Sequence, residues 1–144
     1  MSAEQLFTIA NQTALVGWAI LVFLPRRWDP LFWVPQFVIP GLLSLGYATL
    51  ALLHFGQGDG GFGSIVDVRA LFENDHVLLA GWIHYLAFDL FIVAWIARRS
   101  DALGISRLIQ TVFLGFTFMF GPAGLFMFLV TQALMTKTRK GDAS

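Results

Sequence analysis

The sequence predicts an all-α polytopic membrane protein with four transmembrane helices in a compact bundle. Three observations favour this class: 57% of the 144 residues are hydrophobic, only 12% are charged, and the mean hydropathy is +0.72. A soluble domain of this size needs far more polar surface. Apolar stretches of about twenty residues are instead typical of helices that cross a membrane, so the lipid bilayer is the first expected partner.

Charge and cysteine content exclude several other classes. The formal net charge is zero and no basic face is evident, so we expect no nucleic acid partner. The absence of cysteine excludes disulfides, iron–sulfur clusters and thiolate zinc sites. The N-terminal string MSAEQLF lacks the positive charge of a signal peptide, so we expect the first apolar stretch to be retained. Residues 1–144 are expected to form a single domain.

Four apolar segments define the expected helices. They cover approximately residues 6–24, 32–55, 77–97 and 108–135, and basic or proline-containing strings follow them. At 1.5 Å per residue, the last segment would be about 40 Å long, against a hydrocarbon thickness of about 30 Å. It is therefore too long for one upright span and too short for two.

Pro122, in the string GPAG, stands near the middle of this long segment. Proline cannot donate a backbone hydrogen bond and crowds the carbonyl four residues earlier, which here is that of Phe118. We therefore expect a kink or two half-helices at this point. The freed carbonyl either is an ordinary feature of membrane helices or lines a cavity. Pro40 poses the same alternatives for the carbonyl of Gln36.

A short amphipathic helix is expected between the second and third segments. Ser64 followed by Asp67 resembles a capping box, and four apolar residues then recur at helical spacing. These are Ile65, Val68, Leu71 and Phe72. We predict that residues 64–74 form a helix at the membrane interface that covers one end of the bundle. The alternative is a lid with no further role.

Basic residues give only a weak prediction of the orientation. Four spans place both termini on one side, with five arginines on the other side and four basic residues on the side of the termini. The positive-inside rule then favours termini outside the cytoplasm. The first group is Arg26, Arg27, Arg98, Arg99 and Arg107, and the second is Arg69, Lys137, Arg139 and Lys140.

Asp89 lies near the middle of the third segment, within the string GWIHYLAFDLFIVAW. A charged aspartate at the centre of a membrane helix costs about 2.5–3.5 kcal/mol on insertion scales. Either a polar partner lies beside Asp89, or its carboxyl is protonated. Ionisable groups at this depth usually serve a function, and the alternative is a structural hydrogen bond. The candidate partners from other segments are Asn11, Gln12, Gln36, Tyr47 and Thr117.

Helical periodicity places His84 and Tyr85 on the same broad face as Asp89. Tyr85 and Asp89, four residues apart, can contact each other directly. His84 diverges from Asp89, so the two could flank a ligand but not bond each other. The flat aromatic residues of this face either bind a ligand or face lipid. They are Trp82, Phe88 and Trp95.

The first segment carries a polar patch about two turns from its start. Asn11, Gln12 and Thr13 form this patch. Polar side chains in membrane helices commonly hydrogen-bond neighbouring helices. We therefore expect the patch to contact the third or fourth segment, and Asn11 to belong to the ligand site.

A metal or haem site is the weaker alternative. His54, His76 and His84 could combine with Glu73 or Asp75 into a carboxylate–histidine site. No string has the spacing of a known metal motif, however. We therefore expect no metal and no other cofactor.

Together, these strings resemble a known family. GWIHYLAFDLFIVAW, followed by a short basic connection and FTFMFGPAGLFMF, is similar to the signature of the abscisic-acid-deficient-four-like membrane proteins. These are the plant neoxanthin-synthesis proteins and their bacterial relatives. GSIVDVRALF is also similar, so the resemblance covers nearly the whole chain. Because the chain lacks the transit extension of plastid members, it resembles a bacterial member, located in the inner membrane.

The resemblance implies a link to the conversion of an epoxy-carotenoid into an allenic one. Opening an epoxide to an allene needs an acid for the ring oxygen and a base for a polyene carbon, without redox change. Protonated Asp89 would be the acid, His84 the base, and Tyr85 a hydrogen-bond partner of the oxygen. The motif residues that carry over are Trp82, His84, Tyr85, Asp89, Gly121, Pro122 and Gly124.

Three functions stay open at this point. The leading hypothesis is a carotenoid- or isoprenoid-modifying isomerase of the membrane. The second is a non-catalytic carotenoid- or lipid-binding subunit, and the third is a haem- or metal-binding membrane protein. A carotenoid or another isoprenoid is thus the expected ligand, and a homo-oligomer is left open.

Overall fold

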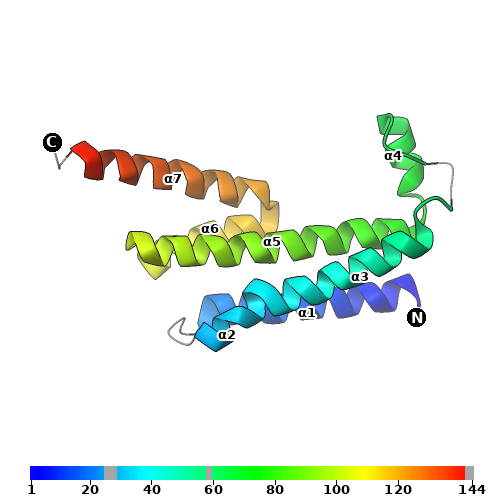
Figure 1. Ribbon diagram of the computed structural model, residues 1–144, viewed down its shortest axis with the longest axis horizontal. Coiled ribbons are helices and arrows are strands. Elements are labelled where there is room, and N and C mark those ends of the chain that lie inside the picture. The colour runs from blue at the N-terminus through cyan, green and yellow to red at the C-terminus, as the bar shows by residue number, and fades with distance from the viewer. Residues whose placement is uncertain (25–28, 58–59, 142–144) are drawn as a thin grey trace.

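The computed structural model describes residues 1–24, 29–57 and 60–141, and these residues form helices and no strand. The all-α prediction is therefore confirmed for the described part of the chain. Figure 1 shows the arrangement. In chain order the elements are α1 (Ala3–Phe23), α2 (Asp29–Trp33), the π-helical η1 (Val34–Val38), α3 (Ile39–His54), α4 (Ile65–Leu71), α5 (Asp75–Leu103), α6 (Arg107–Phe120) and α7 (Pro122–Gly141).

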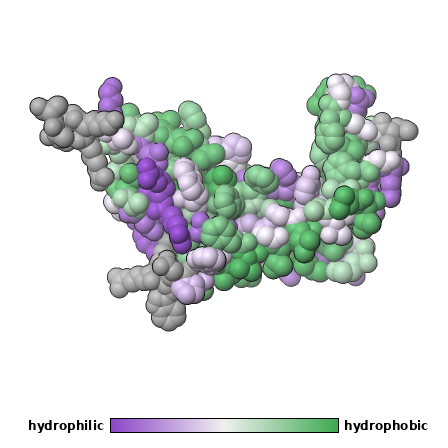
Figure 2. All heavy atoms as spheres, viewed as in Figure 1, coloured by the Kyte–Doolittle hydropathy of each residue, from purple (hydrophilic) through white to green (hydrophobic). Residues whose placement is uncertain are grey.

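Within the described part of the chain, three helical stretches are long and apolar enough to cross a membrane. They are Ala3–Phe23, Pro30–His54 and Asp75–Leu103. Hydrophobic residues cover most of the surface between the two ends of the bundle, and hydrophilic ones gather where α5 ends (Figure 2). Several apolar helices of this length identify a membrane protein.

α5 is the central element of the bundle. It packs against α1, α3 and α6, and its residues Leu90, Val93 and Ile96 are fully buried. The approach of α1 depends on Gly17, because a Cβ there would lie 2.6 Å from a methyl carbon of Leu90. This contact holds the first and third membrane-crossing helices together.

The second membrane-crossing stretch contains a π-helical turn. The N–H of Ile39 bonds the carbonyl of Val34, five residues back, instead of four. Pro40 has no N–H to give the carbonyl of Gln36, and the wider register accommodates that loss. The second proline of the sequence analysis thus coincides with irregular backbone, as Pro122 does.

The fourth apolar segment is interrupted where Pro122 predicts a break. α6 ends at Phe120, α7 begins at Pro122, and Gly121 between them has φ +42°. That region of backbone space favours glycine. The predicted irregularity near Pro122 is confirmed.

The interruption reverses the chain, so the prediction of one span over residues 108–135 is wrong. α6 runs antiparallel to α5, and after Pro122 the chain turns back so that α7 runs antiparallel to α6 (Figure 1). The Trp95 and Phe128 rings meet edge-on at 5.4 Å, and Arg99 Nε donates to Gln132 Oε1 at 3.0 Å. α7 therefore runs in the same direction as α5, and α6 and α7 form a helical hairpin whose tip lies at mid-bundle.

Gly124 allows the two arms of this hairpin to approach closely. A Cβ at Gly124 would collide with the Thr117 hydroxyl and backbone nitrogen, and would lie 2.7 Å from the Phe113 carbonyl oxygen. The Thr117 hydroxyl donates to that same carbonyl at 2.8 Å. A residue with any side chain at Gly124 would force the arms apart.

A helix is present between the second and third segments, but α4 covers only Ile65–Leu71 of the predicted residues 64–74, and it does not lie over the end of the bundle as predicted (Figure 1). The Ser64 hydroxyl accepts the Asp67 N–H at 3.1 Å, as the capping box predicts. α4 points away from the bundle at the end where α3 finishes (Figure 1). Phe72, which follows α4, packs against Gly81 of α5, where a Cβ would lie 2.8 Å from the ring. The location of α4 at a membrane interface stays a prediction.

The hairpin places the two termini at opposite ends of the bundle (Figure 1). Arg98, Arg99, Arg107 and Lys137 then lie at one end, since Arg107 Nη2 donates to the Leu24 carbonyl at 3.1 Å. Arg139 and Lys140 follow Lys137 in α7, whereas Arg26 and Arg27 lie outside the described residues, between Leu24 and Asp29. The expectation that both termini share one side is therefore wrong.

Gly124→Ala should lower the thermal stability of the detergent-solubilised protein by about 1–3 kcal/mol, the usual cost of overpacking. The added methyl meets backbone atoms that cannot move aside independently. Gly115→Ala is the matched control, because it lies in the same hairpin with nothing within 4 Å of its Cβ position. Thermal unfolding followed by circular dichroism measures both. Equal melting temperatures for the two variants would contradict the close packing.

Single cysteines introduced into this cysteine-free chain test the hairpin. In sealed vesicles, Glu4→Cys and Glu73→Cys should react with a membrane-impermeant maleimide from one side, and Thr136→Cys from the other. The hairpin returns the chain to the end where α5 finishes. Labelling in detergent serves as the control for intrinsic reactivity. Labelling of all three from the same side would mean that residues 108–135 cross the membrane once.

Candidate functional site

Asp89 faces the tip of the α6–α7 hairpin. A Cβ at Gly121 would lie 2.9 and 3.0 Å from its two carboxyl oxygens. Asp89 is half-buried, and its Oδ2 atom is buried without a hydrogen-bond partner. The carboxyl also lies where α7 begins, and the positive end of a helix dipole favours negative charge there. The predicted interior placement of Asp89 is confirmed.

We expected Asp89 to hydrogen-bond either a side chain from another segment or Tyr85, and among the described residues it is Tyr85 that interacts with the carboxyl. Asn11 instead accepts from Trp82, with 3.1 Å between Oδ1 and the indole Nε1. The Thr117 hydroxyl bonds within its own helix. Gln12, Gln36 and Tyr47 do not bond the buried Asp89 oxygen either. No candidate from another segment bonds the carboxyl because Gly121, at the hairpin tip, occupies the space beside it.

Tyr85 joins α5 to the carbonyl that Pro122 leaves free. Its hydroxyl donates to the Phe118 carbonyl oxygen at 3.2 Å. The hydroxyl also lies near enough to interact with the Asp89 carboxyl, one helical turn away. Phe118 lines a cavity beside Asp89. The Phe118 carbonyl that Pro122 frees was expected either to be an ordinary feature of a membrane helix or to line a cavity. The arrangement favours the second interpretation.

The inner cavity beside Asp89 has a volume of about 300 Å³. It lies where α1, α5 and α6 meet, and mostly apolar side chains enclose it. The Asn11–Trp82 hydrogen bond ties α1 to α5 at its wall. The lining residues are Asn11, Ala14, Leu15, Trp18, Trp82, Tyr85, Leu86, Asp89, Phe118 and Met119.

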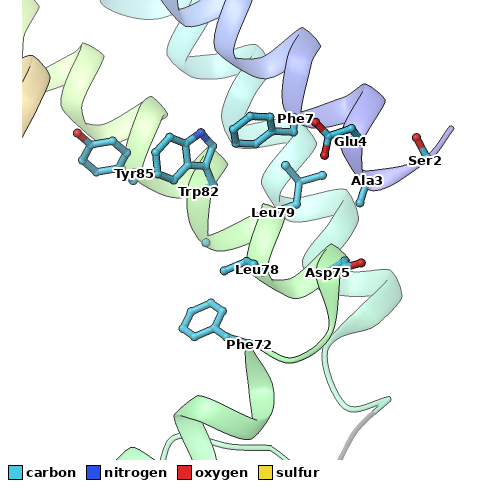
Figure 3. A pocket seen from close by; sticks show the side chains of 11 residues that line it. Ser2, Ala3, Glu4, Phe7, Phe72, Asp75, Leu78, Leu79, Trp82 and Tyr85 are labelled. Atoms are coloured by element: carbon cyan, nitrogen blue, oxygen red, sulfur yellow. The ribbon is translucent and has the colours of Figure 1, made fainter.

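A larger outer cavity of about 690 Å³ continues from the inner one toward the N-terminus of α1. Trp82 and Tyr85 line both cavities, so they adjoin. Figure 3 shows Phe7 beside Trp82, with Phe72 on the far side of the space. The Phe7 and Trp82 rings lie 5.7 Å apart. We call the two cavities together the α1–α5 groove.

Three predicted site residues of α5, His84, Phe88 and Trp95, lie away from this groove. His84 and Phe88 stack with ring centroids 4.5 Å apart, and Tyr47 of α3 meets His84 edge-on at 5.5 Å. They belong to the side of α5 that faces α3. Trp95 packs against Phe128 of α7 instead. The broad face predicted for α5 thus meets several different neighbours, and His84 does not line the groove beside Asp89.

The histidines are also divided between two places. The His54 and His76 rings stack with 4.3 Å between centroids, where α3 ends and α5 begins, while His84 packs with Tyr47 and Phe88. Among the described residues, no group of three or more histidine, cysteine or acidic side chains is placed to hold a metal ion.

Sequence reasoning missed the contribution of α1 and α6 to the groove. Leu15, Trp18 and Phe118 line the inner cavity, and the Trp18 and Phe118 rings meet edge-on at 5.1 Å. Leu15 and Trp18 follow Asn11 by four and seven residues, which places all three on one side of a helix. Extending that side from Asn11 would have found them.

Several membrane-crossing helices, with a half-buried carboxyl at the inner end of an apolar groove between them, define a polytopic membrane protein. The family model described as ABA DEFICIENT 4-like matches residues 5–128, and the chain belongs to this family. The match includes Tyr85, Asp89 and the GPAG string. Membership indicates a carotenoid-related membrane protein. No curated protein and no solved structure gave a match.

Tyr85→Phe should destabilise the protein by about 1 kcal/mol, because the Phe118 carbonyl loses its donor in an apolar setting. Tyr47→Phe is a matched control, since the described contact of Tyr47 is made by its ring. Thermal unfolding in one detergent measures both variants. A Tyr85→Phe protein as stable as the Tyr47→Phe protein would show that the hydrogen bond does not hold the hairpin tip.

Proposed function

We propose that the α1–α5 groove binds a carotenoid or another long isoprenoid, and that Asp89 acts on it by acid–base chemistry. One observation carries the proposal: a buried carboxyl oxygen without a partner stands at the inner end of an apolar, aromatic-lined groove. Family membership supports the ligand class. The proposed activity is a non-redox isomerisation, as the epoxide-to-allene conversion would be.

The groove suits an elongated, flat ligand. Its lining extends along α1 from Ser2 to Trp18, sixteen residue steps, which is about 24 Å at the helical rise. Phe7, Trp18 and Trp82 supply aromatic surfaces, against which a polyene packs through its face. Both volumes fall at the scale of ligand pockets, roughly 300–1,000 Å³.

A single carboxyl can supply both proton transfers of an epoxide-to-allene isomerisation. Protonated Asp89 would give its proton to the ring oxygen as the carbon–oxygen bond breaks. The carboxylate left behind would then take the proton from the polyene carbon as the new double bond forms, which restores the acid. Tyr85 would hold the Asp89 carboxyl in place, since its hydroxyl donates to the Phe118 carbonyl and its lone pairs can accept from protonated Asp89. This assignment replaces His84 as the base.

The second candidate is a non-catalytic carotenoid-binding subunit that supports another enzyme. The position of His84 favours it, because His84 faces α3 and gives the groove no second base. In that case Asp89 would serve only the packing of the hairpin tip against α5. The two candidates share the ligand and differ in turnover.

Asp89→Asn should keep the fold and bind the ligand but lose at least a hundredfold in turnover, because an amide cannot deliver a proton on demand; general acid–base catalysis is worth about 10²–10⁴-fold. The measurement is chromatography of an epoxy-carotenoid incubated with the purified protein, together with ligand retention and detergent stability. If Asp89 serves only the packing of the hairpin tip, the Asp89→Asn protein should keep its activity and the Asp89→Leu protein should misfold. A stable, active Asp89→Leu protein would contradict both. Ligand binding without turnover by the unaltered protein would favour the non-catalytic subunit.

We further propose that the chain lies in a bacterial inner membrane with the N-terminus outside and α7 ending in the cytoplasm. Among the seven basic residues that the structure describes, six belong to elements at the end where α5 finishes, and Arg69 alone belongs to the other end. The positive-inside rule favours that end in the cytoplasm. The cysteine variants test this in intact spheroplasts, where Glu4→Cys should react with the impermeant maleimide and Thr136→Cys should not. The reverse pattern would overturn the orientation.

A further inference from the structure

The side of α5 opposite the groove faces a second polar group without a partner. The Gln36 side chain is 9% exposed, and its Oε1 atom is buried and accepts no hydrogen bond. It lies opposite Ala87, Phe88 and Phe91, the turns of α5 around Asp89. At that depth no water is available to supply the bond, so the unpaired amide oxygen is unfavourable.

The backbone around Gln36 is irregular as well. Gln36 is the central residue of the π-helical turn Val34–Val38, and Pro40 cannot donate to its carbonyl. Single π-helical turns within membrane and soluble helices often mark binding sites, because they redirect side chains and free carbonyls. The irregular turn and the unpaired side chain occur at the same residue, and nothing in the α1–α5 groove requires either.

A cavity of about 350 Å³ lies beside Gln36, between α3 and α5. It shares no lining residue with the groove, so it is a separate space. The Phe37 and Phe91 rings lie 6.3 Å apart at its edge, and both are partly exposed to the lipid side. The lining residues are Gln36, Phe37, Pro40, Gly41, Ser44, Ala87, Phe88 and Phe91.

We propose that this cavity binds the hydroxyl group of a neutral, apolar membrane molecule at the Gln36 amide. A hydroxyl fits because it can donate to the amide oxygen and accept from the amide nitrogen. The lining residues carry no charge, so an anionic or cationic head group would enter without a counter-charge. The phenylalanine rings suit the flat body of an isoprenoid alcohol or a molecule of similar shape. This site is independent of the proposed function at Asp89.

Retinol and its methyl ether, in phosphatidylcholine nanodiscs, provide the test. They share the polyene, but only retinol can donate a hydrogen bond. Energy transfer from tryptophan to the probe reports binding, and Trp33 lies beside Phe37 at 5.3 Å between ring centroids. We expect retinol to bind about tenfold more tightly than the ether, the ratio expected for one buried hydrogen bond. Gln36→Leu should reduce retinol affinity to that of the ether.

A second pair of variants keeps the test decisive if Gln36→Leu does not fold. Gly41 lines the cavity with nothing within 4 Å of its Cβ position, so Gly41→Leu should fill the space and abolish the preference for retinol. Gly46→Leu, on the same helix with equal room, should leave the preference unchanged. Asp89→Asn should also leave it unchanged, which separates this site from the proposed function. Equal affinities for both probes in the unaltered protein, or a preference that survives Gly41→Leu, would overturn the proposal.

Discussion

A backbone carbonyl without its helical donor is the constraint on which the centre of this protein depends. Pro122 removes the donor of the Phe118 carbonyl, and the hydrocarbon interior offers no water to replace it. The Tyr85 hydroxyl supplies the bond at 3.2 Å, which fixes the hairpin tip against one turn of α5. Asp89, one turn further, then meets Gly121, where only a residue without a side chain leaves room for the carboxyl. The string that holds Tyr85 and Asp89 and the string GPAG are therefore the two sides of one contact.

Periodicity and composition predicted the helices well, because each depends on residues close together in the sequence. The break at Pro122 followed from proline chemistry alone, but its direction did not. A kinked span and a reversed chain obey the same local rule at Gly121 and Pro122. The outcome is decided by the fit of Gly124 against Thr117, a contact between two helices that neither segment reveals by itself. The orientation was predicted by counting basic residues on each side of four spans. Because the reversal at Pro122 was not foreseen, the basic residues near the C-terminus were counted on the wrong side.

The candidate site was predicted only in part, because spacing within one helix does not show which neighbouring helix covers each residue. Periodicity correctly placed Tyr85 and Asp89 together, since residues four apart share a side of any helix. It also grouped His84 with them, although α1 and α3 divide that broad face between them. Which neighbour covers which part of α5 depends on small residues such as Gly17, and these contacts are tertiary. Asn11 was the exception, because a polar side chain at that depth must find a partner across the interface, and it bonds Trp82.

The hairpin that stops at mid-bundle also gives the molecule unequal cross-sections. α6 and α7 lie beside α5 only in the half of the bundle where α5 ends, whereas α4 stands away from the bundle at the end where α5 begins (Figure 1). The helices packed around α5 thus displace more lipid from one leaflet than from the other. The α1–α5 groove runs through the narrower half, directly below the hairpin tip. For the ligand proposed above, this arrangement means a route to Asp89 by sideways diffusion within that leaflet, without passage through water.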